Sequence, residues 1–286
     1  MAYFDNFNKQ DWHEIGMTES AIRPYPLTQD DLDRCAIIAD EIISKYEKRI
    51  MYPSKELTLG NVLQGAATVY YNLGMHNNAK RAVSILQQIQ YQDNRSERPE
   101  SLTVQSYLIR TGATVCKKPY YLDVPRKFNV SSIYFMVHEI AHMLKEDNYL
   151  ECKGIYTDIE VIPILLELIS AHVRGDNNVF RLRELLMLDV AYNYKKLQED
   201  LDNNLISKDD MLAFNTFFGH NASYLNSFYY ALRLFGMYLE APKYVLGIID
   251  DVLNHRLTTR DVIHNYLSND DYTYETGIDQ FRSKLK

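Results

Sequence analysis

Apolar residues recur along most of the chain at the spacing of three to four residues that is typical of amphipathic helices. In TQDDLDRCAIIADEIISKYEK, residues 28–48, the apolar positions Leu32, Cys35 and Ala39 follow this spacing, and Thr28 is the predicted N-cap. The same spacing predicts helices over 57–74 and 77–90. After Pro125 it predicts further helices over 131–146, 158–174, 178–201, 207–218, 220–240 and 243–254. The pattern therefore favours a largely helical protein.

Alternation replaces helical spacing in one stretch, SLTVQSYLIRTGATVCKKPYYLDVP, residues 101–125. Its β-branched and aromatic residues predict two or three strands with a turn near Gly112. The expected fold class is therefore mostly α with a small β-sheet (α+β). A single domain is expected over 1–286, because no internal repeat or low-complexity linker divides the chain. Its expected parts are a helical N-terminal part (1–100), the small sheet (101–126) and a second helical part (127–286).

Composition and charge narrow the classes of partner. The 286-residue chain is 46% apolar and 24% charged, and its 31 Lys and Arg against 38 Asp and Glu give a net charge of −7. These proportions are ordinary for a globular protein. An acidic chain without a long basic run is a poor candidate for binding nucleic acid or an anionic membrane. A peptide or protein substrate is the expected partner, and the sequence leaves the oligomeric state open.

The sequence shows no clear targeting segment and no cysteine pattern typical of disulfide or redox sites. Cys35, Cys116 and Cys152 are irregularly spaced and indicate neither a disulfide framework nor a CxxC site. The N-terminal stretch MAYFDNFNKQDWHEIG is too polar for a signal peptide, and no apolar run reaches the length of a membrane span. The expected location is therefore the cytoplasm.

One motif carries specific chemistry: VHEIAHMLKED, residues 137–147, contains HExxH as His138, Glu139 and His142. Residues four apart lie on one face of a helix, so both imidazoles can reach one metal ion. Glu139 is rotated by about 100° from His138, where a general base for a zinc-activated water would be needed. The apolar flanks predict a buried helix, and burying these polar groups without a partner is costly. The motif therefore predicts a Zn²⁺ site in which His138 and His142 are ligands.

The third ligand must come from elsewhere. A metzincin would continue as HExxHxxGxxH, but Lys145 and Asn148 occupy those positions. The next predicted helix carries Glu160 and Glu167, which are seven residues apart and hence on one face. Glu160 is the preferred ligand. Glu167 is the natural hydrogen-bond acceptor for a ligand histidine, and it remains the alternative ligand.

Glu160 also has a purely structural interpretation. Thr157-x-x-Glu160 fits a capping box, in which the glutamate would bind the backbone at a helix start. Pro163 argues against it, because a helix that began at Thr157 would place a proline where a backbone N–H is wanted.

Three separated motifs together resemble the thimet oligopeptidase and oligopeptidase F family of zinc peptidases, which are gluzincins. In that family HExxH is followed by a helix with a Glu-x6-Glu spacing, which TDIEVIPILLE preserves as Glu160 and Glu167, with its proline one place later. The family then has a histidine and, nine residues later, a Tyr-Tyr pair. HNASYLNSFYY has His220, Tyr229 and Tyr230 at that spacing. The resemblance covers roughly residues 130–245.

The resemblance implies roles for these residues. His220 and Tyr229 would donate hydrogen bonds to the oxyanion of the tetrahedral intermediate, and Tyr224 and Tyr230 would contact substrate. The strands before HExxH would bind extended peptide backbone. Two departures are Lys145, where the family usually has a further histidine, and Leu225, where it has a tyrosine.

The predicted function is a zinc-dependent metallopeptidase of gluzincin type, with His138, His142 and Glu160 as ligands and Glu139 as general base. The alternative is a non-catalytic protein in which zinc joins helices and the surface binds a peptide or partner. Glu139 discriminates between them, because a structural zinc site has no use for it and is normally closed by four protein ligands. A regulatory protease with a single protein target is a third, lower-ranked hypothesis.

Overall fold

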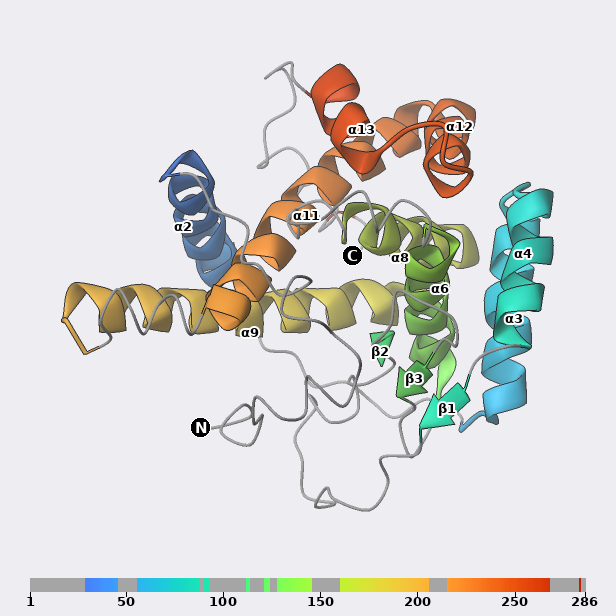
Figure 1. Cartoon of the computed structure of the whole chain (residues 1–286), viewed down its shortest axis with the longest axis horizontal. Helices are drawn as coiled ribbons and strands as arrows, with labels where there is room; N and C mark the ends of the chain where they lie inside the picture. Colours follow the sequence, from blue (N-terminus) through green and yellow to red (C-terminus); the bar gives the residue numbers. More distant parts are fainter. Residues whose placement is uncertain are drawn as a thin grey trace.

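The computed structural model describes residues 29–45, 56–87, 90–92, 112–113, 121–123, 128–145, 160–205, 215–267 and Ser283. Its helices are α2 (Gln29–Lys45), α3 (Leu59–Asn72), α4 (His76–Leu86), α6 (Val130–Leu144), α8 (Val161–Arg174), α9 (Asn177–Asp202), α11 (Asn215–Glu240), α12 (Pro242–Leu253) and α13 (Thr259–Tyr266). The strands are β1 (Gln90–Gln92), β2 (Gly112–Ala113) and β3 (Tyr121–Asp123). Figure 1 shows these elements coloured along the chain.

Most predicted helices are confirmed within a few residues, and two details differ. The helix α11 is continuous through residue 219, where a break between two helices was predicted. The helix α13 was not predicted, although Thr258 and Asp261 form a capping box at its start. The predicted N-cap Thr28 lies outside the described residues.

The predicted α+β fold class is wrong, because the described chain is almost entirely helical. Among the described residues, strand pairing consists of ladders of two or three residues, with order β1-β3-β2, β1 parallel to β3 and β2 antiparallel to it, and of one isolated bridge between Leu57 and Phe128. The strand β1 comes from a segment outside 101–126. Gly112 itself lies in β2 and pairs with Asp123 of β3, and the neighbouring residues on which the predicted turn would fall lie outside the described residues. Strand propensity depends strongly on context, and ladders this short form no layer of the fold.

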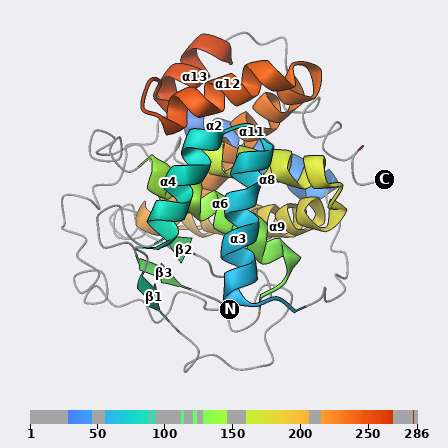
Figure 2. The same cartoon turned by 90° about the vertical axis from the view of Figure 1, so that its right-hand side faces the viewer.

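The helix α6, which carries HExxH, lies between α3 on one side and α8 on the other (Figures 1 and 2). The helix α8 packs in turn on α11 and α9, and α2 packs on α9 and α11. One connected cluster of buried side chains extends from Cys35 on α2 to Val262 on α13. No helix within the described ranges has the length and apolar character needed to cross a membrane.

Hydrogen bonds at three points along α6 hold it in place. At its start, Asn129 accepts a hydrogen bond from the backbone N–H of Ser131, while the Ser132 hydroxyl accepts one from the backbone N–H of Asn129. The buried Tyr70 hydroxyl of α3 donates to the Val137 carbonyl at 2.8 Å. At its end, Arg81 of α4 donates to the Leu144 carbonyl at 2.9 Å. The helix is therefore held at its start, its middle and its end.

Candidate metal centre

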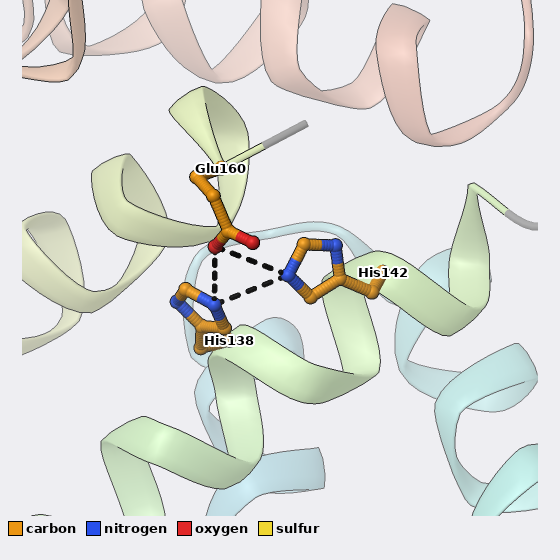
Figure 3. Close-up of side chains that lie close together, drawn as sticks. All are labelled: His138, His142 and Glu160. Carbon is orange, nitrogen blue, oxygen red and sulfur yellow. Dashed lines mark hydrogen bonds and ion pairs between the residues drawn. The ribbon is translucent and has the colours of Figure 1, made fainter. Parts of the chain in front are cut away.

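The side chains of His138, His142 and Glu160 converge on one point between α6 and the start of α8 (Figure 3). His138 Nε2 lies 2.9 Å from Glu160 Oε2, His142 Nε2 lies 3.3 Å from the same oxygen, and the two nitrogens are 3.1 Å apart. These three residues could hold a metal ion.

The size of this triangle suits a small metal ion. With zinc–ligand distances of about 2.0–2.1 Å and tetrahedral angles, two ligand atoms lie about 3.3–3.4 Å apart. The observed separations of 2.9–3.3 Å need to expand by only a few tenths of an ångström. Two imidazole nitrogens and one carboxylate oxygen also form a donor set that transition metals prefer. The residues therefore fit a bound ion in both spacing and chemistry.

The position of Glu160 follows from where α8 begins. The helix begins at Val161, and Pro163 falls in its first turn, where no backbone N–H is needed. Glu160 is the N-cap residue, and its side chain makes no capping hydrogen bond. Thr157 lies outside the described residues, so the proposed capping box with it is not described. The Glu160 carboxylate is instead directed toward the two histidines, at a helix N-terminus that favours negative charge.

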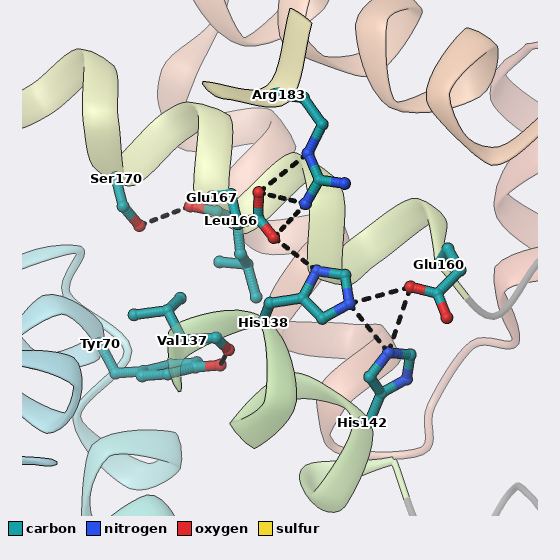
Figure 4. Close-up of polar contacts among 9 residues, drawn as sticks. All are labelled: Tyr70, Val137, His138, His142, Glu160, Leu166, Glu167, Ser170 and Arg183. Carbon is teal, nitrogen blue, oxygen red and sulfur yellow. Dashed lines mark hydrogen bonds and ion pairs between the residues drawn. The ribbon is translucent and has the colours of Figure 1, made fainter. Parts of the chain in front are cut away.

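A second carboxylate lies behind His138. His138 Nδ1 is 2.7 Å from Glu167 Oε1, on the side of the ring opposite Glu160 (Figure 4). Glu167 is in turn paired with Arg183 of α9, whose Nε lies 3.1 Å from Glu167 Oε2 and whose Nη2 contacts both carboxylate oxygens. Glu167 and Arg183 are 1% and 3% exposed. Glu167 thus lies where a ligand histidine finds its hydrogen-bond acceptor, and Glu160 is the glutamate that meets both Nε2 atoms.

The charges of the centre favour a cation. Burial lowers the pKa of His138, but the carboxylates of Glu167 and Glu160 outweigh burial and raise it to about 10. Burial would raise the pKa of Glu160, but His142 and His138 hold it well below its usual range. For Glu167, the burial effect is opposed by Arg183 and His138, and its pKa is lowered. Two ionised carboxylates therefore surround His138, and a metal ion would supply the positive charge that they stabilise.

The side chains become more exposed from one end of the triangle to the other. The side chain of His138 is 6% exposed, that of Glu160 14% and that of His142 18%. Water or a ligand therefore reaches the triangle more readily on the side of His142 and Glu160.

Glu139 and Tyr224 lie close to the triangle. Glu139 is buried on α6 and 7% exposed. Burial raises the pKa of Tyr224 on α11 well above its usual range, and the carboxylates of Glu160 and Glu139 raise it further. The Tyr224 phenol thus lies within electrostatic range of both carboxylates, and α11 contributes a hydroxyl to this region.

The other residues named on α11 are placed differently. Tyr229 has its hydroxyl 3.5 Å from Arg233 and its ring against Tyr230. The Tyr230 hydroxyl accepts a hydrogen bond from Arg34 of α2 at 3.1 Å. His220 belongs to α11, and its side chain lies outside the described parts of the chain.

Arg183, which pairs with Glu167, was not predicted from the sequence. It lies 16 positions after Glu167 on the following helix, in the stretch NNVFRLRELL, which resembles no metal-binding motif. The one available signal was an arginine at a position that the apolar spacing of its helix predicts to be buried, since a buried charge needs a partner of opposite charge.

Comparison with known proteins adds no family. No family model, no curated protein and no solved structure matches this chain. The geometry of the centre is therefore the main observation from which a function can be inferred.

Proposed function

We propose that this protein is a zinc-dependent metallopeptidase in which His138, His142 and Glu160 bind the metal and Glu139 is the general base. The observation that carries the proposal is the triangle of two imidazole nitrogens and one carboxylate oxygen, 2.9–3.3 Å apart, with Glu139 adjacent on the same helix. The resemblance of HExxH, Glu-x6-Glu and the Tyr-Tyr pair to gluzincin oligopeptidases supports the same reaction.

The donor set favours zinc. Calcium and magnesium prefer oxygen ligands, whereas zinc is bound by histidine nitrogen and carboxylate oxygen. Structural zinc sites normally have four protein ligands, and catalytic sites have three and keep one position open. The described group has three residues. Together with Glu139 beside them, these three residues match a catalytic site, whereas a structural site has no use for such a carboxylate.

In the proposed reaction, Glu139 transfers a proton from the attacking water to the amide nitrogen. A bound zinc ion would supply Lewis acidity to the reaction. The Glu139 carboxylate takes a proton from the attacking water as the water oxygen bonds to the peptide carbonyl carbon. It then gives that proton to the amide nitrogen as the C–N bond breaks. The low exposure of Glu139 limits competing hydrogen bonds from water, which strengthens this proton transfer.

The developing oxyanion needs a donor, and α11 offers two candidates. The resemblance favours Tyr229 together with His220. The electrostatics favour Tyr224, because the carboxylates of Glu160 and Glu139 add to burial in raising the pKa of its phenol, whereas Tyr229 contacts Arg233 and Tyr230. We therefore assign the donor role to Tyr224 and keep Tyr229 as the alternative.

The experiment combines metal analysis with peptide hydrolysis. The purified protein should contain about one zinc ion per chain, and His142→Ala should lose it, since a site of three protein ligands closes only when all three bind. The wild-type protein should cleave members of a peptide library. This activity should be lost on addition of a chelator and restored on addition of Zn²⁺. Iron as the bound metal would contradict the proposal, since two histidines and one carboxylate can also bind Fe²⁺. Zinc without hydrolysis of any peptide would favour the non-catalytic alternative.

A further inference from the structure

We propose that Arg183 is a positioning residue for the metal centre: it fixes Glu167, and Glu167 fixes the ring of His138. This inference rests on the proposed metal site. It adds a residue from a third helix, α9, to ligands that come from α6 and the start of α8.

The contacts form a chain of three side chains. The Arg183 guanidinium holds both oxygens of Glu167, with Nε donating to Oε2 at 3.1 Å and Nη2 contacting Oε1 and Oε2. Glu167 Oε1 lies 2.7 Å from His138 Nδ1. His138 Nε2, at the far side of the ring, lies 2.9 Å from Glu160 Oε2. Figure 4 shows the order from Arg183 through Glu167 and His138 to Glu160.

Stability alone is a weak reason for this arrangement. Arg183, Glu167 and His138 are 3%, 1% and 4% exposed, so two full charges are removed from water. Buried ion pairs often contribute no more to stability than well-packed apolar residues of similar volume. The cost becomes reasonable if the pair serves a third group, and His138 Nδ1 is the third group in contact.

The choice of arginine explains how positioning would work. A guanidinium presents two parallel N–H donors that match a carboxylate, so it fixes the carboxylate's rotation as well as its place. A fixed carboxylate acceptor at Nδ1 selects the imidazole tautomer with hydrogen at Nδ1. The lone pair is then at Nε2, which points to Glu160 and His142. A lysine at 183 would supply the charge without the two parallel donors.

The test measures metal affinity in the full chain, using Zn²⁺ in competition with a chelator and the visible spectrum of the Co²⁺-substituted protein. The variants are Arg183→Met, Glu167→Gln and their combination. Each single change should weaken Zn²⁺ binding by about 10–100-fold, as is typical when a group behind a ligand histidine is lost. The double variant should lose no more than the worse single variant, because both act through one contact. The Co²⁺ spectrum should change in all three.

Two further variants separate positioning from charge and from stability. Arg183→Lys keeps the charge and should still bind Zn²⁺ about as weakly as Arg183→Met; it also keeps the test usable if Arg183→Met does not fold. Arg233→Met removes another buried arginine, also 3% exposed, which contacts Tyr229 and is not among the residues of the candidate ligand group. It should lower the melting temperature and leave Zn²⁺ affinity unchanged.

The proposal is overturned if Arg183→Met binds Zn²⁺ as wild type does, if Arg183→Lys restores full affinity, or if the losses in the double variant multiply. A wild-type protein that binds neither Zn²⁺ nor Co²⁺ would instead refute the metal site itself. The two failures are therefore distinguishable.

Discussion

The helix pair α6–α8 and the helix α11 both border the candidate metal centre, but they differ in how they present side chains to it. On α6, His138 and His142 are four residues apart and therefore lie on one face, where both meet Glu160 at the start of α8. On α11, Tyr224 and Tyr229 are five residues apart, which turns them about 140° from each other. The two tyrosines cannot both face the same point.

Residue spacing within a helix shows which side chains share a face, but it does not show which face is turned toward the site. The spacing of His138 and His142 is enough to predict that both can reach one metal ion, because residues four apart share a helix face. The tyrosines of α11 are distinguished by their neighbours: the carboxylates of Glu160 and Glu139 near Tyr224, and Arg233 at Tyr229. Variants in each region can break or sharpen this contrast.

The largest expected effect lies on α6. Glu139→Gln should lower kcat for peptide hydrolysis by about 10²–10⁴-fold, because an amide cannot accept the proton of the attacking water. Zinc content should stay at the wild-type level, since Glu139 is not among the three residues of the triangle. Metal analysis and kcat on one sample test this, and unchanged hydrolysis would remove Glu139 from the mechanism.

A somewhat smaller effect is expected on α11. Tyr224→Phe should lower kcat by about 10²–10³-fold with little change in KM, because a phenol donor to the oxyanion acts chiefly in the transition state. The matched Tyr229→Phe variant should keep kcat near wild type. Both should retain zinc. The reverse ranking would restore Tyr229 to the role that the resemblance implies.

The two glutamates of the α8 segment should differ in metal affinity. Glu167→Ala should weaken Zn²⁺ binding by about 10–100-fold, because it leaves His138 bound but without its acceptor. Glu160→Ala should weaken it by more than that, since a donor atom itself is lost. Chelator competition measures both. If Glu167→Ala proved the more damaging, Glu167 would be the ligand and the triangle would need another third member.

The smallest expected effect concerns the support of α6. A Cβ atom on Gly65 of α3 would lie 2.8 Å from Ile133 Cδ1 and 3.1 Å from Ile133 Cγ1 on α6. Gly65→Ala should therefore lower the free energy of unfolding by about 1 kcal/mol, because overpacking outweighs the gain in helix propensity.

Gly247 on α12 is the matched control, since a Cβ there meets nothing within 4 Å. Gly247→Ala should raise the free energy of unfolding by about 0.5–1 kcal/mol, the usual preference of a helix for alanine. Chemical denaturation of both variants tests the pair. Equal stabilisation by the two substitutions would mean that α3 and α6 approach less closely than described.

The sequence predicted the helical segments well and the strands poorly. The periodicity over 131–146 and 158–174 marks α6 and α8, because their apolar faces repeat at helical spacing. The stretch 101–125 alternates as a strand does, yet the described pairing is limited to a few residues and includes Gln90–Gln92 from outside it. Strand pairing joins distant segments, so local pattern constrains it less than it constrains a helix.

For the centre itself, the sequence alone determined that His138 and His142 share a helix face and that Glu139 stands beside them, because helix geometry is a local property. It left Glu160 and Glu167 as competing ligands. Only the tertiary structure separated them: the start of α8 brings Glu160 to both Nε2 atoms, and the next turns bring Glu167 to Nδ1 of His138. Tertiary packing alone also brought Arg183 from α9 to Glu167, and the carboxylates within range of Tyr224. These contacts join segments that are far apart in the chain, and no periodicity encodes which faces of two helices will meet.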